Sequence, residues 1–287
     1  MTLLDGKKLS QQIKDEAKAQ ASELRASGIT PTLAVILVGD DAPSHTYVNA
    51  KAKACEYCGI KSLVYKLGAD TTQSELLALI NTLNFDDSVD GILVQLPLPA
   101  HINKATIIEA ISTHKDVDGF HPFNVGLLNT GFESGLLPCT PLGVIRLLKA
   151  YDINVESLNA VVIGASNIVG RPMATMLLNL GASVSVCHIK TRDLRFYTKE
   201  ADLIVVAAGC VNLLKADMVK EGVIVVDVGI NRLANGKLVG DVDFDNVRKK
   251  ASFISPVPGG VGAMTIAMLM ANTIKATLAH RNLREKG

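Results

Sequence analysis

Short apolar runs alternate with longer amphipathic stretches along the first half of the chain. The runs are rich in β-branched residues, whereas the longer stretches show helical spacing, and one opens with the capping box Thr72-Gln-Ser-Glu75. Because the two kinds of segment alternate with short connections, the pattern predicts a parallel sheet flanked by helices. We expect strands at 33–38, 63–67 and 91–96, and helices at 9–27, 44–58 and 72–84.

The alternation resumes after Thr140-Pro141, a cap residue followed by proline in the first helical turn. We expect helices at 140–151, 166–180 and 216–220, and strands at 161–163, 183–187, 203–206 and 223–228. This order is Rossmann-like. A last helix at 264–280 carries one apolar face and should return to pack on the first domain; the face consists of Met264, Ala267, Met268, Ala271, Ile274 and Leu278.

Between the two halves, the periodicity fades into a stretch with glycine, proline and asparagine at 116–138. We interpret this stretch as a long functional loop that crosses between domains. The sequence therefore predicts an α/β protein of two domains. Residues 1–139 form an N-terminal α/β substrate domain, on which the C-terminal helix 264–287 packs, and residues 140–263 form a Rossmann-like domain.

Composition narrows the class of partner. The 287 residues are 48% hydrophobic, and the formal net charge of +1 comes from lysines and arginines spread along the chain. This distribution favours a small-molecule substrate over nucleic acid or a membrane surface. We see no signal segment and no apolar run that approaches the roughly 20 residues of a spanning helix. Five cysteines without a framework pattern fit reduced thiols, so we expect a cytoplasmic protein.

The stretch Val161–Pro172 reads as a strand, a tight turn and the start of a helix. Gly164 permits the turn, and Ser166 and Asn167 can cap a helix whose first amides face a nucleotide phosphate. As a dinucleotide fingerprint the match is incomplete, because Ser166 and Val169 replace two glycines and Gly170 comes one place late. The same pattern also describes βα units that bind nothing.

Four residues of the first half are candidates for chemistry. Tyr47 and Lys51 project from one face of a predicted helix, four residues apart, although a solvated lysine would show the same spacing. Gln95 is the polar break near the carboxyl end of a strand, where open α/β sheets place ligands. Asp118 precedes Gly119, a pair that ordinarily forms a turn.

We considered and rejected two metal sites. His114, Asp116, Asp118 and His121 crowd one short segment, but the cluster is equally a polar loop. The pair Cys55 and Cys58 has C-x-x-C spacing but stands on a predicted helix without a second pair or a nearby histidine. We therefore predict no metal.

Two segments of the second half could contact a flat ligand. The stretch Ser255–Gly262 combines two prolines with three glycines, which leave backbone amides uncovered; it could equally be a rigid hinge. Where NAD-binding domains place a carboxylate for the ribose, this chain has the basic segment Cys187–Arg192. Basic groups without a carboxylate suit a 2′-phosphate and favour NADP over NAD.

Taken together, these stretches resemble the bifunctional methylenetetrahydrofolate dehydrogenase/cyclohydrolase family over nearly the whole chain. The resemblance rests on seven motifs in the family's order: Tyr47-Val-Asn-Ala-Lys51, Val94-Gln-Leu-Pro-Leu-Pro99, Lys115-Asp-Val-Asp-Gly-Phe120, Pro138-Cys-Thr-Pro141, Gly164-Ala-Ser-Asn-Ile-Val-Gly-Arg-Pro172, Asp227-Val-Gly-Ile-Asn231 and Pro258-Gly-Gly-Val-Gly262.

The resemblance implies two consecutive reactions on a one-carbon unit carried by tetrahydrofolate. NADP-dependent oxidation of 5,10-methylene-tetrahydrofolate gives the 5,10-methenyl cation, and hydrolysis of that cation gives 10-formyl-tetrahydrofolate. It also implies a homodimer, formed through the Rossmann half. Because hydride transfer needs the nicotinamide ring against the folate carbon, we expect the active site in the cleft between the two domains.

By position in the family's motifs, Lys51 would be the central catalytic residue, oriented by Tyr47 beside the pterin and hydrogen-bonded by Gln95. Asp118 would anchor the amino edge of the pterin. To act as a base beside a cation, Lys51 must lose its proton near neutral pH, which partial desolvation favours. The substrate-binding set adds Val94, Leu96, Pro258, Gly259, Gly260 and Val261, and the cofactor-binding set is Thr140, Gly164, Ala165, Ser166, His188, Ile189, Lys190, Arg192, Gly229 and Ile230.

Two positions depart from the family's usual pattern. Ala263 stands where the glycine loop usually continues with proline, and Ile189 stands where many members have a serine. Lys190 or Arg192 could compensate for the hydrogen bond that Ile189 cannot make. Two alternatives stay open from the sequence: another two-domain NADP dehydrogenase, such as a shikimate-type enzyme, and a non-catalytic NADP-binding sensor or scaffold.

Overall fold

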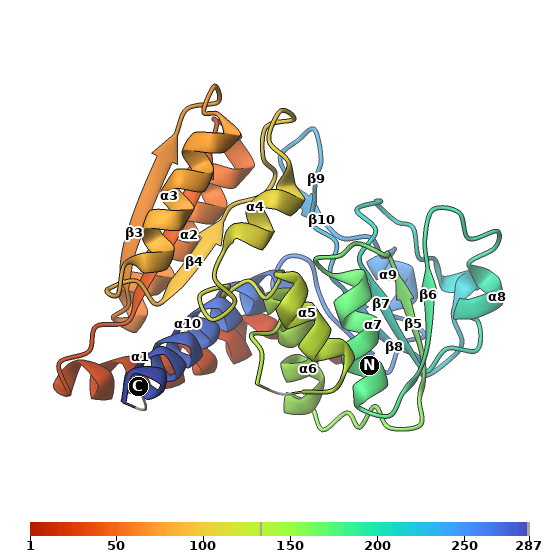
Figure 1. The fold of residues 1–287 in the computed structure, drawn as a ribbon. Coiled ribbons are helices and arrows are strands. Elements are labelled where there is room, and N and C mark those ends of the chain that lie inside the picture. The colour runs from red at the N-terminus through yellow and green to blue at the C-terminus, as the bar shows by residue number, and fades with distance from the viewer. Residues whose placement is uncertain (133, 286–287) are drawn as a thin grey trace. The chain divides into compact units, whose positions relative to one another are not determined.

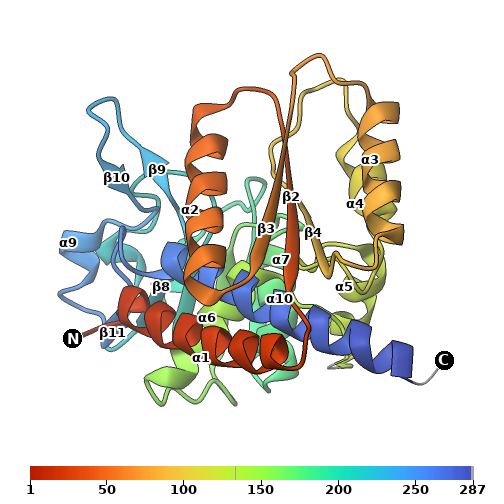
Figure 2. The same ribbon diagram turned by 90° about the vertical axis from the view of Figure 1, so that its left-hand side faces the viewer.

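The computed structural model describes residues 1–132 and 134–285, shown in Figure 1 and, after a quarter turn, in Figure 2. The chain divides into two compact units. Unit 1 comprises Met1–Ser10 and Thr140–Thr265, and unit 2 comprises Gln11–Cys139 and the described residues from Ile266 onward. Each unit contains one parallel sheet.

Unit 2 is built on a three-stranded parallel sheet in the order β3-β2-β4. The strands are β3 (Lys61–Leu67), β2 (Thr32–Val38) and β4 (Gly91–Val94). Every residue of β2 is buried, because neighbours pair with both its edges and helices cover the sheet. This position explains why β2 is a continuous apolar run rather than an alternating one.

Helices enclose this sheet, with α2 on one side and α3 and α4 on the other (Figure 2). The predicted capping box is confirmed, since the Thr72 side chain accepts from the Glu75 amide and the Glu75 carboxylate accepts from the Thr72 amide. Asp41 caps α2 by accepting from the Ser44 amide, and Gly59 ends it with a positive φ. The helices that lie wholly or mostly in unit 2 are α1 (Gly6–Ala26), α2 (Ala42–Cys58), α3 (Gln73–Phe85), α4 (Lys104–Ala110), α5 (Pro122–Asn129) and α10 (Val261–Glu285).

The interpretation of 116–138 as one long loop was wrong. This stretch contains α5, which Pro122 opens and which the His121 ring caps by accepting from the Phe123 amide at 3.0 Å. The sequence pattern also left α4 unassigned. Both helices are too short for helical periodicity to be distinguished from a loop.

Unit 1 is built on a six-stranded parallel sheet, with α7 (Gly170–Asn179) packed on two of its strands. The strands, in spatial order, are β1 (Thr2–Leu3), β11 (Phe253–Ile254), β8 (Ile224–Asp227), β7 (Leu203–Val206), β5 (Asn159–Ile163) and β6 (Ser183–Cys187). The remaining elements of this unit are α6 (Cys139–Ala150), α8 (Arg195–Thr198), the 3-10 turn Ala216–Met218, α9 (Phe244–Val247) and the antiparallel pair β9 (Asn231–Arg232) and β10 (Leu238–Val239).

The first ten residues group with unit 1, whereas the sequence analysis placed all of 1–139 in one domain. The reason is that β1 pairs in parallel with β11, and the Lys7 amide donates to the Gly259 carbonyl at 2.9 Å. A two-residue edge strand has no sequence signature of its own, so this return of the chain start could not be predicted.

Helix α10 is more apolar than the sequence analysis allowed. Its segment Val261–Arg281 is long and apolar enough to cross a membrane by length and composition, but 61% of that window is buried inside the protein. Most of the predicted apolar face is buried, including Met268 and Ile274, whereas Leu278 is 43% exposed. The helix is therefore apolar because it is a core element.

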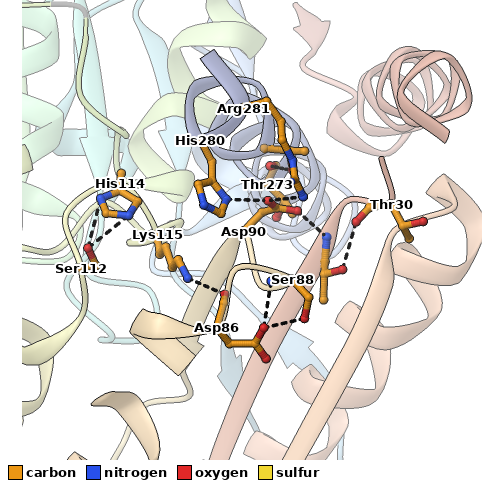
Figure 3. A network of polar contacts seen from close by, with 12 residues as sticks. Thr30, Asp86, Ser88, Asp90, Ser112, His114, Lys115, Thr273, His280 and Arg281 are labelled. Atoms are coloured by element: carbon orange, nitrogen blue, oxygen red, sulfur yellow. Dashed lines mark hydrogen bonds and ion pairs between the residues drawn. The ribbon is translucent and has the colours of Figure 1, made fainter. Parts of the chain in front are cut away.

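A buried carboxylate attaches α10 to the start of the unit 2 sheet (Figure 3). Asp90 is fully buried and directly precedes β4. One of its oxygens accepts from the Thr32 amide at 3.0 Å, and the other lies 3.0 Å from Nδ1 of His280 and 3.8 Å from Arg281. This carboxylate thus links the first residues of β2 and β4 to the C-terminal helix.

We predict that Asp90→Ala lowers the free energy of unfolding by roughly 3 kcal/mol, because it leaves a buried histidine and a buried amide without their acceptor. Asp86→Ala is the matched control, since the Asp86 carboxylate accepts from Ser88 at the surface of a neighbouring loop; it should cost about 1 kcal/mol or less. Urea denaturation of both variants measures the difference. Equal losses would contradict the role assigned to Asp90.

Candidate active site

The central feature of unit 2 is a nearly buried lysine with one specific partner. Lys51 lies on α2 and is 9% exposed. Its ammonium donates to Oε1 of Gln95 at 2.9 Å, so the predicted hydrogen bond between the two is present. The Gln95 amide nitrogen donates in turn to the Leu96 carbonyl at 2.6 Å, which fixes which end of the amide faces Lys51. Tyr47, one turn earlier on α2, is 39% exposed.

The sheet explains where this pair lies. Gln95 directly follows β4, and its backbone amide donates to the Ile36 carbonyl of β2 at 2.8 Å. The side chain therefore stands at the carboxyl edge of the central strands, the edge at which open α/β sheets bind ligands. The lysine approaches this edge from the helix that follows β2.

Asp118 belongs to the same electrostatic environment. It lies in a turn closed by the Gly119 amide, which donates to the Asp116 carbonyl at 3.0 Å. Burial raises the pKa of Asp118 to about 6, and the nearby Lys51 ammonium opposes that shift. Asp118 also lines a small cavity together with Val94 and Leu96, two of the predicted substrate-binding residues. The structure thus brings these side chains together at one edge of the sheet.

The acidic and histidine cluster of 114–121 has structural partners. The Asp116 carboxylate accepts from the amides of Phe120 and His121 and from the Asn124 side chain. His114 contacts the Ser112 hydroxyl. Over residues 1–132 and 134–285, no group of three or more histidine, cysteine or carboxylate side chains is arranged to hold a metal ion.

Cys55 and Cys58 are both buried and free of disulfide bonds. Burial raises the pKa of Cys55 to about 12 and that of Cys58 to about 11. Both remain thiols near neutral pH and pack as small apolar side chains.

In unit 1, the turn after β5 can be made only with glycine at two positions. Gly164 has φ +121°, and a Cβ there would lie 2.1 Å from the Ala207 carbonyl oxygen. A Cβ at Gly170 would lie 1.9 Å from the carbonyl oxygen of Gly164. Because these two residues have no side chain, the turn packs directly against the start of α7 and the residue that follows β7. Phosphate-binding βα turns require this close packing.

The predicted cap of α7 needs a correction. The helix begins at Gly170, two residues later than a cap at Asn167 would give, and its N-cap residue Val169 makes no side-chain cap. Ser166 Oγ instead accepts from the amides of Val169 and Gly170 and so stabilises the turn before the helix. In the same turn, the Ala165 carbonyl accepts a hydrogen bond from Nε of Arg171.

The basic segment after β6 forms a compact turn. The His188 amide donates to the Thr191 hydroxyl at 2.9 Å, and the Lys190 amide donates to Nδ1 of His188 at 3.1 Å. This turn leaves Ile189 fully exposed and presents Lys190 and Arg192 to solvent. The exposed cations fit an anionic group such as a ribose 2′-phosphate.

Two buried carboxylates organise the next loops of unit 1, and the sequence analysis missed one of them. Asp227, at the end of β8, accepts from the amides of Gly229, Asp241 and Val242, and burial raises its pKa to about 6. Asp241 accepts from the amides of Ala208 and Gly209, just after β7. A Cβ at Gly229 would lie 2.2 Å from the Asp241 carboxylate. The exposed Ile230 follows directly.

The glycine loop 258–262 is also fixed in unit 1. Gly259 has φ +108°, and a Cβ at Gly260 would lie 2.6 Å from the Pro256 carbonyl oxygen. Helix α10 begins at Val261, so Ala263 lies in its first turn, where a proline would sacrifice no helical hydrogen bond. The hydroxyls of Thr140 and Thr265 lie 2.9 Å apart.

Comparison with known proteins identifies the family. The tetrahydrofolate dehydrogenase/cyclohydrolase catalytic domain matches residues 4–118, and the NAD(P)-binding domain of the same family matches residues 138–281. The bifunctional protein FolD of Campylobacter jejuni is 72% identical over 276 residues, which cover 96% of this chain and 98% of the relative. The chain belongs to the tetrahydrofolate dehydrogenase/cyclohydrolase family.

Solved structures of the family agree with this assignment. The crystal structure of the bifunctional methylenetetrahydrofolate dehydrogenase/cyclohydrolase FolD from Campylobacter jejuni has a TM-score of 0.96 and 71% identity, covering 97% of this chain and 99% of that one. The enzyme of Trypanosoma brucei, crystallised with NADP and an inhibitor, has a TM-score of 0.94 and 36% identity, covering 99% of each chain.

As a member of this family, the chain is an enzyme with methylenetetrahydrofolate dehydrogenase and cyclohydrolase activities. The predicted fold class is confirmed, with an N-terminal catalytic domain and a C-terminal NAD(P)-binding domain, both on parallel sheets. The family assignment also decides against the shikimate-type and non-catalytic alternatives.

We predict that Gly170→Ala weakens NAD(P) binding at least tenfold and lowers the free energy of unfolding by about 2 kcal/mol, because the added methyl group displaces the Gly164 carbonyl. Gly126→Ala is the matched control: Gly126 lies within helix α5 and a Cβ there meets nothing within 4 Å. That variant should be neutral or stabilised by up to about 1 kcal/mol. Fluorescence titration of the cofactor tests both. Wild-type affinity in Gly170→Ala would refute the close packing as a requirement for binding.

Proposed function

We propose that Lys51, Gln95, Tyr47 and Asp118 of unit 2 act on the folate, and that unit 1 binds NADP. The observation that carries the proposal is the hydrogen bond of 2.9 Å between the nearly buried Lys51 ammonium and Gln95, with Asp118 close enough to interact electrostatically. A lysine held out of solvent at a ligand-binding edge is suited to proton transfer.

In this proposal Asp118 anchors the pterin. The amino edge of a pterin offers N–H donors, and a carboxylate that accepts two of them orients the ring. With a pKa of about 6, Asp118 is mainly ionised at neutral pH and is therefore an acceptor. The half-exposed ring of Tyr47 supplies a flat apolar surface beside the pterin. Val94 and Leu96 line the cavity next to Asp118.

The residues of unit 1 fit the cofactor. NADP, when bound, supplies the hydride acceptor for oxidation of the methylene group. The Gly164–Gly170 turn would hold the pyrophosphate, since it leads directly into the N-terminus of α7. The exposed side chains of Lys190 and Arg192, with His188, would hold the 2′-phosphate. The predicted roles of Thr140, Gly229 and Ile230 complete this set.

In the cyclohydrolase step, Lys51 accepts a proton and then returns it. Water adds to the carbon of the 5,10-methenyl cation, and Lys51 acts as the base that takes the proton that the water loses. The hydroxyl group on this carbon then loses its proton to solvent as the bond from the carbon to N5 breaks, and N5 keeps the electron pair and takes the proton back from Lys51, which leaves the formyl group on N10. Gln95 keeps the Lys51 nitrogen in one position during both proton transfers.

The proposal extends to domains, assembly and compartment. We propose that 11–139 with most of α10 forms the folate domain, and that 1–10 with 140–265 forms the NADP domain, a division that the compact units support. We also propose a homodimer formed through the NADP domain. A cytoplasmic location is supported by five cysteines that are all free.

Turnover of 5,10-methylene-tetrahydrofolate tests the proposal, with reduced nicotinamide and the methenyl chromophore followed together. We expect reduction of NADP at least tenfold faster than reduction of NAD, without build-up of the methenyl product. In Lys51→Gln we expect hydrolysis of the methenyl product to fall by about 100-fold or more, because the proton acceptor is gone, with NADP affinity unchanged.

Lys53→Gln is the control, because Lys53 is exposed on the same helix and the chemical change is the same. It should retain both activities. If Lys51→Gln hydrolyses the methenyl product at the wild-type rate, Lys51 is not the base. A preference for NAD would overturn the role of the basic segment.

A further inference from the structure

One side chain of α10 binds both the residue before Asp118 and a second backbone segment that packs against the Asp118 turn. Asn272 is buried, and its amide nitrogen donates to the Val117 carbonyl at 2.9 Å and to the Leu137 carbonyl at 2.8 Å. An amide NH₂ group has two donors, so these two carbonyls satisfy it completely. Val117 directly precedes Asp118, and Leu137 belongs to the segment that leads into Cys139.

The turn itself is packed against that second segment. Gly119 has φ +70°, and a Cβ there would lie 2.5 Å from the Leu137 carbonyl carbon and 2.6 Å from the Pro138 nitrogen. The Asp118-Gly119 turn and Leu137–Pro138 are therefore in backbone contact, and Asn272 joins the two from the helix side. The Cys139 thiol also donates to the Val117 carbonyl at 3.3 Å. Burial raises the pKa of Cys139 well above its usual value, so this donor stays protonated.

The residues before the turn are fixed independently. The buried Lys115 ammonium donates to the Leu83 and Asp86 carbonyls, and the Lys115 carbonyl accepts from the Ile92 amide of β4 at 2.7 Å. The Asp116 carboxylate holds the residues that follow the turn. The Val117 carbonyl is held by the side chains of Asn272 and Cys139, and its carbon is bonded to the Asp118 amide nitrogen.

We propose that Asn272 is a positioning residue for folate binding, which sets the direction of the Asp118 side chain by holding the carbonyl groups of Val117 and Leu137. The inference rests on the proposed role of Asp118 in folate binding. Asn272 touches no reacting atom and acts through Asp118. Since the pterin anchor is used in the ground state and the transition state alike, its loss should raise KM for the folate and leave kcat nearly unchanged.

The test substitutes Asn272→Leu, which keeps a similar volume and removes both donors. We expect KM for 5,10-methylene-tetrahydrofolate to rise about tenfold, kcat to change by less than about twofold, and KM for NADP to stay unchanged. Thr277→Val is the matched control, because Thr277 is fully buried on the same helix and its hydroxyl donates to the Thr273 carbonyl of that helix. That variant tests general loss of helix stability and should keep the wild-type KM.

A double substitution separates positioning from a merely structural role. In Asp118→Asn, adding Asn272→Leu should raise KM for the folate by less than about twofold, because the group that Asn272 positions is already changed. A further tenfold rise would overturn the inference, as would an Asn272→Leu variant with the folate KM of Thr277→Val. If Asn272→Leu does not fold, Asn272→Ser, which keeps one donor, serves in the same cycle.

The single variant Asp118→Asn tests the role of Asp118 separately from the role of Asn272. If it leaves KM for the folate unchanged, the role of Asp118 in the proposed function is wrong and the inference about Asn272 falls with it. If Asp118→Asn raises that KM and Asn272→Leu does not, only the inference about Asn272 is overturned.

Discussion

A nearly buried ammonium group must keep a hydrogen-bond acceptor. In unit 2, the end of β4 places Gln95 where it meets this requirement for Lys51. The acceptor, Gln95, is available only because β4 ends one residue earlier, next to the end of β2. The parallel strands place their carboxyl ends at one edge, and α2 brings the lysine to the same edge. Burial raises the pKa of Asp118, and the positive charge of Lys51 opposes that shift. Lys51 and Gln95 thus meet because the parallel strands end at the same edge of the sheet.

Unit 1 uses the same edge of its own sheet differently. Gly164 and Gly170 have no side chain, so the backbone segments around them pack closely. The buried carboxylates of Asp227 and Asp241 accept hydrogen bonds from backbone amides of the loops that follow β7 and β8. Backbone groups fixed in this way need no movement when an anionic cofactor binds. In the proposed function, the exposed side chains of Lys190 and Arg192 recognise the 2′-phosphate of the cofactor.

Periodicity was sufficient to predict the buried strands, because residues such as those of β2 and β7 form apolar runs with clear ends. The positions of Lys51 on a helix and Gln95 at a strand end were predictable as local features, whereas the hydrogen bond between them was predicted only from the resemblance to the family. The roles of Asn272, Asp241 and Asp90 were not predictable, since each bonds to residues distant in the sequence and stands in a segment dominated by another pattern. The short helix α5 and the edge strand β1 were missed for lack of length.

The most direct test of the folate site in unit 2 is the affinity for folic acid, measured by calorimetric titration between pH 5 and 7.5. The pKa of Asp118 is raised to about 6, so the fraction of ionised carboxylate falls as the pH drops through that value. If Asp118 binds the folate as a carboxylate, wild-type affinity weakens as the pH falls through about 6, and Asp118→Asn binds weakly with no such dependence. An affinity that is constant across this range in the wild type, or the same pH dependence in Asp118→Asn, would contradict that role of Asp118.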